Sequence, residues 1–174
     1  MTRIDNRTND QLRPINIIEN FVSCAEGSFL IEVGRTRELC NASIESNVPR
    51  WLEGKGKGWV TAEYSLLPRS TDSRVQRERK SVSGRTQEIQ RLIGRSLRAV
   101  TDLEALGENS IIIDCDVLEA DGGTRTASIV GAFMALAQAI KIIKSEQGIE
   151  KQILKHFVTA VSVGVLDKTP ILDL

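Results

Sequence analysis

Residues 111–145 read IIIDCDVLEADGGTRTASIVGAFMALAQAIKIIKS, an apolar run followed by a glycine turn and a second apolar run. The first run, 111–118, is short and bounded by polar residues, and predicts a buried strand. Asp114 and Asp116 lie on one face of that strand, because successive side chains alternate. After the turn at 120–123, residues 126–145 predict a helix that is apolar nearly all round, and which therefore lies buried between layers.

Towards the N-terminus, residues 28–67 predict a three-stranded meander. Its strands are expected at 28–34, 37–46 and 58–67, where apolar residues alternate between Gly- and Pro-containing turns. The glycine-rich run 54–58 is followed by a strand and not by a helix, so it predicts a flexible hairpin tip with lysines available to a polyanion.

Residues 69–83 are rich in Arg and Ser, without periodicity, and predict a mobile loop. Apolar residues then recur at helical spacing, which predicts a helix over 85–106 that Gly107 stops. On that helix Arg91, Arg95 and Arg98 fall on the face opposite the apolar side, and are expected to form an exposed row of guanidinium groups.

The C-terminal part predicts a short helix at 150–156, a strand at 158–166, a turn at Asp167 and Lys168, and the start of another segment at 169–174. Strands and helices in this order fit a two-layer α+β or α/β domain. We expect residues 1–174 to form a single domain.

The chain has 174 residues, 41% hydrophobic and 26% charged, with 23 basic and 23 acidic residues. This is the composition of a globular domain. The apolar run at 129–140 is shorter than the roughly 20 residues of a membrane span. The polar N-terminus lacks the apolar region of a secretory signal, so we expect a cytoplasmic protein without a membrane partner.

Three cysteines, Cys24, Cys40 and Cys115, are spaced too widely for paired metal-binding motifs, and we expect reduced, packed thiols. The single histidine, His156, excludes most zinc sites and makes histidine acid–base chemistry improbable. It is expected on the surface of the short helix at 150–156.

Charge is unevenly distributed despite the net charge of zero. Residues 69–98 hold nine basic and three acidic side chains, a net charge of +6, so the rest of the chain carries −6. Such segregation favours a phosphate-rich partner. A solvated helix face with an exposed loop would give the same pattern, and charge alone does not separate the two interpretations.

The turn and helix start at 121–128, DGGTRTAS, carry the sharpest chemical signal. Paired glycines let the backbone approach a ligand, the first helical turn offers free N–H groups, and Arg125 adds a forked cation, which together suit phosphate. The alternative is an ordinary glycine turn with a threonine N-cap. Gly84, Arg85 and Thr86 repeat the arrangement at the other helix, although sequence spacing does not show whether the two meet.

Four segments together resemble the ribonuclease PH family of phosphorolytic 3′→5′ exoribonucleases, which trim tRNA 3′ ends. They are RIDNRTNDQLRPI (3–15), GWVTAEYSLLPRST (58–71), SGRTQEIQRLIGRSLRAV (83–100) and IIIDCDVLEADGGTRTASIVGA (111–132). The resemblance implies an α+β fold with a two-layer β-α-β-α core, a mixed sheet and buried helices, shared with polynucleotide phosphorylase and exosome ring subunits. It also implies a homo-hexameric ring built as a trimer of dimers.

The resemblance further implies that inorganic phosphate attacks the terminal phosphodiester of RNA, releasing a nucleoside diphosphate in a step that reverses to nucleotide addition. Because phosphate is itself an anionic nucleophile, no catalytic histidine is required. The phosphate-binding residues implied are Arg85, Gly123, Thr124 and Arg125, with Arg85 and Arg125 catalytic. The RNA-binding residues implied are Arg69, Arg74, Arg77, Arg91, Arg95 and Arg98. Precursors of tRNA, and also rRNA, are the expected substrates.

In one respect the chain departs from the family pattern. Family members continue past the segment matching 169–174 to a pair of aspartates that bind Mg²⁺, so the metal ligands are expected beyond Leu174 and the domain is expected to be shortened at its C-terminus. Asp114, Asp116 and Asp121 are a possible substitute, but we favour a structural role for them, since carboxylate spacing alone is a weak metal signal. A non-catalytic RNA-binding ring subunit is the alternative function.

Overall fold

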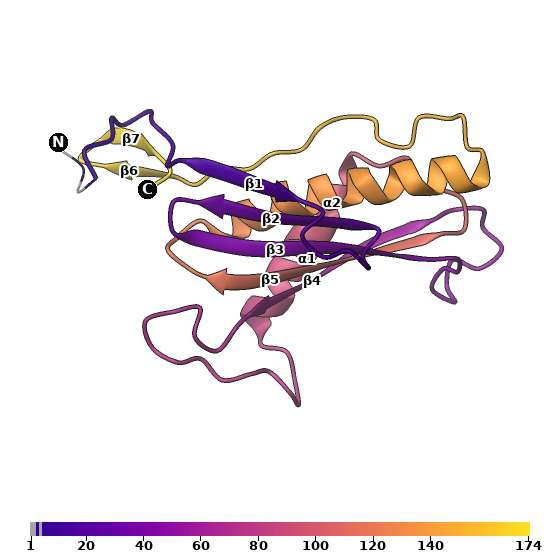
Figure 1. The fold of residues 1–174 in the computed structure, drawn as a ribbon, viewed down its shortest axis with the longest axis horizontal. Helices are drawn as coiled ribbons and strands as arrows, with labels where there is room; N and C mark the ends of the chain where they lie inside the picture. The colour runs from indigo at the N-terminus through magenta and orange to yellow at the C-terminus, as the bar shows by residue number, and fades with distance from the viewer. Residues whose placement is uncertain (1–2, 4) are drawn as a thin grey trace.

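A five-stranded sheet with helices α1 and α2 packed on one face forms the body of the molecule (Figure 1). The computed structural model describes residue 3 and residues 5–174; Ile4 of the segment at 3–15 lies outside the described residues. The elements are β1 (Ile15–Glu19), β2 (Gly27–Val33), β3 (Thr36–Glu45), β4 (Trp59–Leu66), α1 (Gly84–Ala99), β5 (Ser110–Glu119), α2 (Thr124–Gln147), β6 (Val163–Leu166) and β7 (Thr169–Leu172). The predicted two-layer α+β class with a mixed sheet and buried helices is confirmed.

The predicted meander is wrong at its third strand. The sheet order is β1-β2-β3-β5-β4, so β5 lies between β3 and β4, antiparallel to the first and parallel to the second. On its helix-facing side β5 carries Ile111, Ile113, Cys115 and Val117, all buried. A strand this apolar is best buried when it is paired on both edges, and helix α1 supplies the crossover that a parallel β4–β5 pair requires.

Strand β1 was not predicted. Its five residues are all exposed, and it pairs only with β2 at the edge of the sheet, with Ile15 opposite Val33. Without a buried face it lacks the alternation of apolar and polar residues that marks a strand.

Helix α1 ends at Ala99, well before the predicted end at 106. Thr101 forms a bridge with Leu154, and the Asp102 carboxylate accepts hydrogen bonds from the N–H groups of Glu104 and Ala105 at 3.1 and 3.0 Å. These bonds start a separate turn that buries Leu106. The apolar spacing therefore continues past the point where the helix stops.

The predicted helix at 150–156 is wrong. The backbone there bonds to the end of α1 instead, with the Asp102 N–H donating to Ile153 O at 2.7 Å and the Lys155 N–H to Val100 O at 2.8 Å. His156 is exposed, as expected, but lies on no helix. The predicted strand at 158–166 is shorter in the structure, where only residues 163–166 form a strand, β6. Strand β6 pairs with β7 across the predicted turn, where Asp167 and Lys168 both have positive φ.

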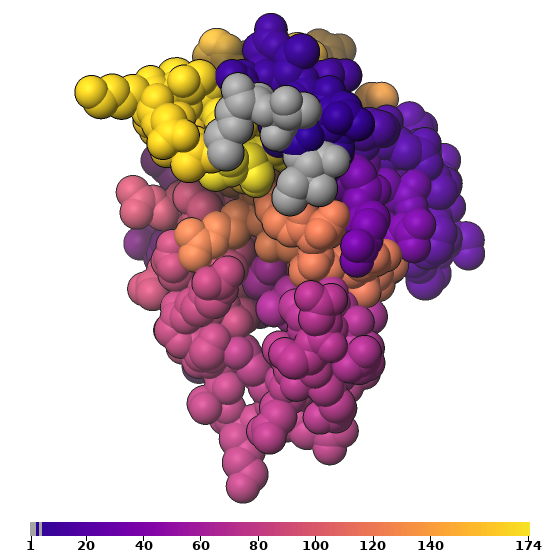
Figure 2. Space-filling view, turned by 90° about the vertical axis from the view of Figure 1, so that its left-hand side faces the viewer, coloured from indigo at the N-terminus to yellow at the C-terminus, as the bar shows by residue number. Residues whose placement is uncertain are grey.

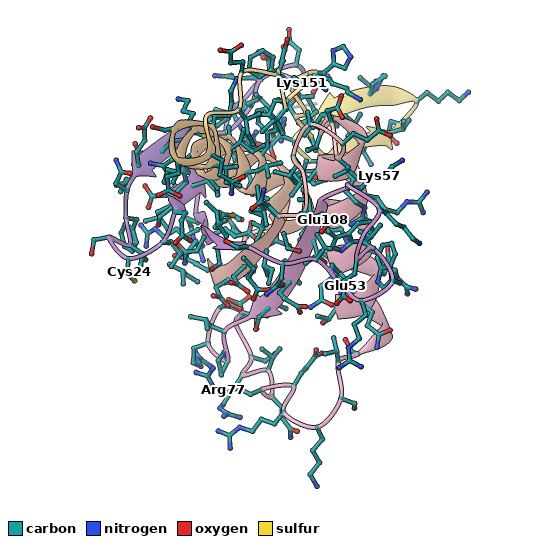
Figure 3. The ribbon with its side chains drawn as sticks, turned by 90° about the vertical axis from the view of Figure 1, so that its right-hand side faces the viewer. Cys24, Glu53, Lys57, Arg77, Glu108 and Lys151 are labelled. Carbon is teal, nitrogen blue, oxygen red and sulfur yellow. The ribbon has the colours of Figure 1, made fainter. Side chains whose placement is uncertain are left out.

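Helix α2 extends two residues beyond each predicted end and packs against β2, β3, β5 and α1. By length and composition alone it could cross a membrane, and 61% of its most apolar window is buried inside the molecule. Contact with the sheet accounts for its apolar composition. Cys40 and Cys115 are buried free thiols with sulfurs 3.8 Å apart, as predicted, whereas Cys24 is exposed (Figure 3).

Helix α2 approaches β2 so closely that Gly27 has no room for a side chain. A Cβ there would lie 2.2 Å from the backbone oxygen of Ala135. We expect Gly27→Ala to lower the free energy of unfolding by about 2 kcal/mol or more, because the helix must move off the sheet. Urea unfolding checks this, with Gly84→Ala as a control at a position with nothing within 4 Å. Equal stability of the two variants would contradict the close packing.

Candidate functional site

The starts of helices α1 and α2 meet in one pocket of about 290 Å³ at the edge of the sheet. Its lining residues are Tyr64, Leu66, Thr71, Arg85, Ala120, Gly122, Gly123, Thr124, Arg125 and Ser162. The structure thus brings together Arg85, Gly123, Thr124 and Arg125, four residues singled out from the sequence. It also adds Tyr64 from β4 and Ser162 from the C-terminal segment.

The glycine turn before α2 leaves the helix start without a side-chain cap. Gly122 and Gly123 have φ of 82° and 72°, in the left-handed region that glycine adopts without strain. Gly123 is the N-cap and Thr124 is already helical, and within residue 3 and residues 5–174 no side chain caps the free N–H groups. The alternative of a threonine N-cap is therefore wrong, and the first-turn N–H groups are available to an anion.

Arg125 faces a carboxylate that sequence reasoning did not include in the site. Its guanidinium lies 3.3 Å from both carboxylate oxygens of Glu88 on α1. Both side chains are substantially exposed, so the pair contributes little stability. It nevertheless links the two helices and holds the guanidinium at the mouth of the pocket. Glu88 follows Arg85 by three residues on the same helix, a spacing that could have indicated it.

Tyr64 was also missed. Its hydroxyl lies 3.0 Å from that of Thr124, and burial raises the pKa of the phenol, so Tyr64 stays neutral and fixes the threonine at the start of α2. Nothing in the local sequence of β4 distinguishes this tyrosine from an ordinary core aromatic.

Behind the pocket lies a fully buried carboxyl group. The carboxyl group of Glu38 on β3 forms a hydrogen bond with the Ser128 hydroxyl, and that hydroxyl oxygen also lies 2.8 Å from Thr124 O. Among the residues that the structure describes, the second carboxyl oxygen of Glu38 is buried and has no hydrogen-bond partner. Burial raises the pKa of Glu38 to about 8, with Asp116 adding to the effect and Ser128 opposing it. Glu38 is therefore protonated at neutral pH and places no negative charge behind the pocket.

The predicted basic loop at 69–83 projects from the body of the molecule (Figure 2). It carries the exposed side chains of Arg69, Arg74 and Arg77, of which Arg77 is labelled in Figure 3. Arg91 and Arg95 are exposed on α1, as predicted. Arg98 is not part of that exposed row. It is half-buried, donates to Val60 O at 2.6 Å and stacks on the Trp59 ring at 4.3 Å. Burial, together with the nearby Arg95, lowers its pKa.

The predicted hairpin tip at 54–58 also differs, because the strands on either side of it do not pair with each other. Gly56 donates its N–H to Glu108 at 3.1 Å and Lys57 pairs with Glu104 at 2.9 Å. Residues 54–58 are therefore part of the connection between β3 and β4, and these two contacts attach them to the turn that follows α1.

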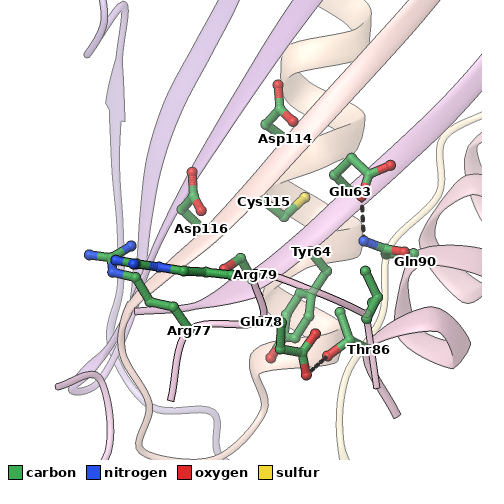
Figure 4. Close-up of a pocket in the computed structure, with 12 residues that line it drawn as sticks. Glu63, Tyr64, Arg77, Glu78, Arg79, Thr86, Gln90, Asp114, Cys115 and Asp116 are labelled. Atoms are coloured by element: carbon green, nitrogen blue, oxygen red, sulfur yellow. Dashed lines mark hydrogen bonds between the residues drawn. The ribbon is translucent and has the colours of Figure 1, made fainter. Parts of the chain in front are cut away.

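Asp114 and Asp116 project from one side of β5 into a separate pocket of about 380 Å³ under the basic loop (Figure 4). Burial raises the pKa of both carboxyl groups. Asp121 does not join them: its carboxylate lies 4.0 Å from Arg13 Nη1, and its backbone N–H and carbonyl bond to Thr36 and Arg13. Residue 3 and residues 5–174 hold no group of three or more His, Cys, Asp or Glu side chains placed to bind a metal ion. These residues alone do not fit the implied Mg²⁺, and no catalytic step is assigned to it.

Residues 11–141 match the family model described as the 3′ exoribonuclease family, domain 1. The chain therefore belongs to the 3′ exoribonuclease family. Within that family it is 59% identical to ribonuclease PH of Syntrophomonas wolfei over 176 residues, which cover the whole chain and 74% of that protein.

Solved structures show the same fold. Rice (Oryza sativa) Rrp46 has a TM-score of 0.78 at 23% identity, covering 98% of this chain and 72% of the rice chain. The Archaeoglobus fulgidus exosome with RNA bound to the active site has a TM-score of 0.78 at 22% identity, covering 99% of this chain and 70% of the other.

Glu38 predicts a pH dependence of stability. An unfolded chain loses this proton near the ordinary pKa of 4.5, whereas the folded protein retains it up to about 8, so the folded state loses stability as pH rises between these values. We expect Glu38→Gln to remove this loss, measured by urea unfolding at a series of pH values. Glu32→Gln is the control. A hydrogen bond from Asn16 is the main cause that lowers the pKa of Glu32, so removing this carboxyl group should change the pH dependence of stability in the opposite sense. Parallel pH curves for Glu38→Gln and the unaltered protein would contradict this assignment.

Proposed function

We propose that this protein is a phosphate-dependent 3′→5′ exoribonuclease that trims the 3′ ends of tRNA precursors, and also of rRNA, releasing nucleoside diphosphates. The reverse reaction adds nucleotides. The observation that carries the proposal is the meeting of Arg85 and Arg125 with the uncapped glycine turn in one pocket. Membership of the 3′ exoribonuclease family and the identity with ribonuclease PH support it.

In this proposal the pocket holds inorganic phosphate. The two guanidinium groups and the N–H groups at the start of α2 bind its oxygens and offset its charge. One phosphate oxygen attacks the phosphorus of the last phosphodiester bond, and the 3′ oxygen of the preceding nucleotide leaves. The protein contributes positioning and charge stabilisation, so the reaction needs no histidine near the pocket.

Upstream RNA phosphates are assigned to the exposed arginines on either side of the start of α1. Arg69, Arg74 and Arg77 approach from the loop, while Arg91 and Arg95 continue along the helix. Contacts of this type bind any sequence, since each involves a phosphate and not a base.

Three further proposals concern the assembly, the metal and the location of the protein. The chain assembles as a homo-hexamer, a trimer of dimers, which native mass spectrometry would test. The reaction requires Mg²⁺, which chelation and Mg²⁺ re-addition would test. The protein acts in the cytoplasm, which cell fractionation would test.

Arg125→Ala is expected to lower phosphate-dependent kcat/KM by about 100-fold or more, since it removes a preorganised charge from the reacting phosphate. RNA binding should change little. The measurement is release of nucleoside diphosphates from RNA at varied phosphate, with the exposed Arg50→Ala as the control. Equal loss of activity and RNA binding would make Arg125 an RNA contact. Release of monophosphates by the unaltered protein would overturn phosphorolysis, and RNA binding without products would favour the non-catalytic subunit.

Arg95 and Arg98 should behave differently although they lie one turn apart. Arg95→Gln should reduce the salt dependence of RNA binding by the equivalent of about one phosphate contact. Arg98→Gln should leave that salt dependence unchanged and lower the free energy of unfolding by about 1–2 kcal/mol, through loss of its bond to Val60 and its stacking on Trp59. Salt titrations of RNA binding and urea unfolding check both, and the reverse pattern would contradict the assignment.

A further inference from the structure

Arg13 joins three distant parts of the chain behind the glycine turn. Its guanidinium donates from Nη1 to Asp121 O at 2.6 Å and from Nη2 to Gly122 O at 3.3 Å. On its other side it forms a two-point pair with Asp173, from Nε to Oδ2 at 2.9 Å and from Nη2 to Oδ1 at 2.7 Å. Its side chain is 11% exposed, and its stem lies over Gly34, where a Cβ would be 2.7 Å from Arg13 Cδ.

These contacts fix the direction of two consecutive peptide groups. In a trans peptide the C=O and the following N–H point in opposite directions, and the described residues contain no cis bond. Holding the carbonyls of Asp121 and Gly122 towards Arg13 therefore turns the N–H groups of Gly122 and Gly123 away from it. Both glycines line the pocket that also contains Arg85 and Arg125, whereas Arg13 does not.

Thr36 supports the same orientation from the sheet. Its buried hydroxyl donates to Gly122 O at 2.7 Å and accepts from the Asp121 N–H at 2.9 Å. Two independent side chains thus hold one carbonyl, that of Gly122. A glycine turn left to itself would sample several orientations, because glycine is restricted least of all residues.

The pairing with Asp173 keeps Arg13 in place. Hydrogen bonds from Arg13 lower the pKa of Asp173 to about 2, and the same pair raises the pKa of Arg13. The carboxylate is thus ionised throughout the neutral range, and the guanidinium keeps its geometry.

We propose that Arg13 is a positioning residue for phosphate, which holds the Asp121 and Gly122 carbonyls so that the following N–H groups face the anion. This inference rests on the proposed function, because it assigns a role towards the phosphate of that reaction. Arg13 itself touches neither phosphate nor RNA, and acts through the backbone of the turn and through an ion pair at 4.0 Å with the Asp121 carboxylate.

The test uses Arg13→Met, which retains the length of the stem and removes every side-chain donor. KM for inorganic phosphate, or its Kd by calorimetry, should rise about tenfold or more, as expected for loss of hydrogen bonds to charged and backbone groups. KM for RNA should be unchanged. Methylguanidine added at millimolar concentration should partly restore phosphate binding by Arg13→Ala.

Arg7→Met is the matched control. Arg7 also pairs with Asp173, at 2.9 Å, but its other partners are Asp5 and the carbonyls of Gln11 and Asp173, none of which belongs to the turn. Arg7→Met should leave phosphate binding unchanged. If both variants weaken phosphate binding equally, or if both KM values rise together in Arg13→Met, the positioning role is wrong and Arg13 serves the fold.

If Arg13→Met does not fold, Thr36→Val tests the same orientation from the sheet side. The substitution should weaken phosphate binding without changing KM for RNA, and unchanged phosphate binding would overturn the inference. Phosphate binding by the unaltered protein distinguishes failure of the proposed function from failure of the role assigned to Arg13. Failure to bind phosphate at all would overturn the proposed function, whereas normal phosphate binding by both the unaltered protein and folded Arg13→Met would overturn the role of Arg13 alone.

Discussion

The parallel pairing of β4 with β5 is the constraint on which the rest of the structure depends. Two parallel strands that follow each other in the chain need a crossover, and α1 supplies it by running back across the sheet. The chain leaves β4 and β5 at the same edge, so α1 and α2 both begin there. The pocket containing Arg85 and Arg125 is a consequence of this topology.

This dependence explains which parts of the site the sequence could predict. The DGGTRT turn and the GRT start of α1 carry their chemistry locally, in glycines, threonines and arginines that precede a helix. Whether the two helix starts meet depends on the order of the strands in the sheet. The alternation of apolar residues predicts that a segment is a strand, but it does not predict which strands pair with it. The predicted meander placed β4 beside β3, which would have left the meeting of the two helix starts unexplained.

Other residues escaped prediction because their roles come only from tertiary contact. Glu38 occupies an ordinary position in the alternating pattern of β3, yet its carboxyl group is fully buried. Arg98 follows the helical period of Arg91 and Arg95, but Trp59 lies beside it and removes it from the exposed row. Helix ends were similarly misjudged wherever backbone groups found partners outside the helix, as at Thr101 and Asp102.

The contact of Arg13 with Asp173 and the glycine turn also has a consequence for the order of assembly during synthesis. The sheet, both helices and the turn are complete in the nascent chain before Asp173 leaves the ribosome. Until Asp173 has been made, Arg13 has only its partners near the start of α2. The Arg13–Asp173 pair joins residues 160 positions apart, so it is among the last contacts that synthesis makes available to the turn.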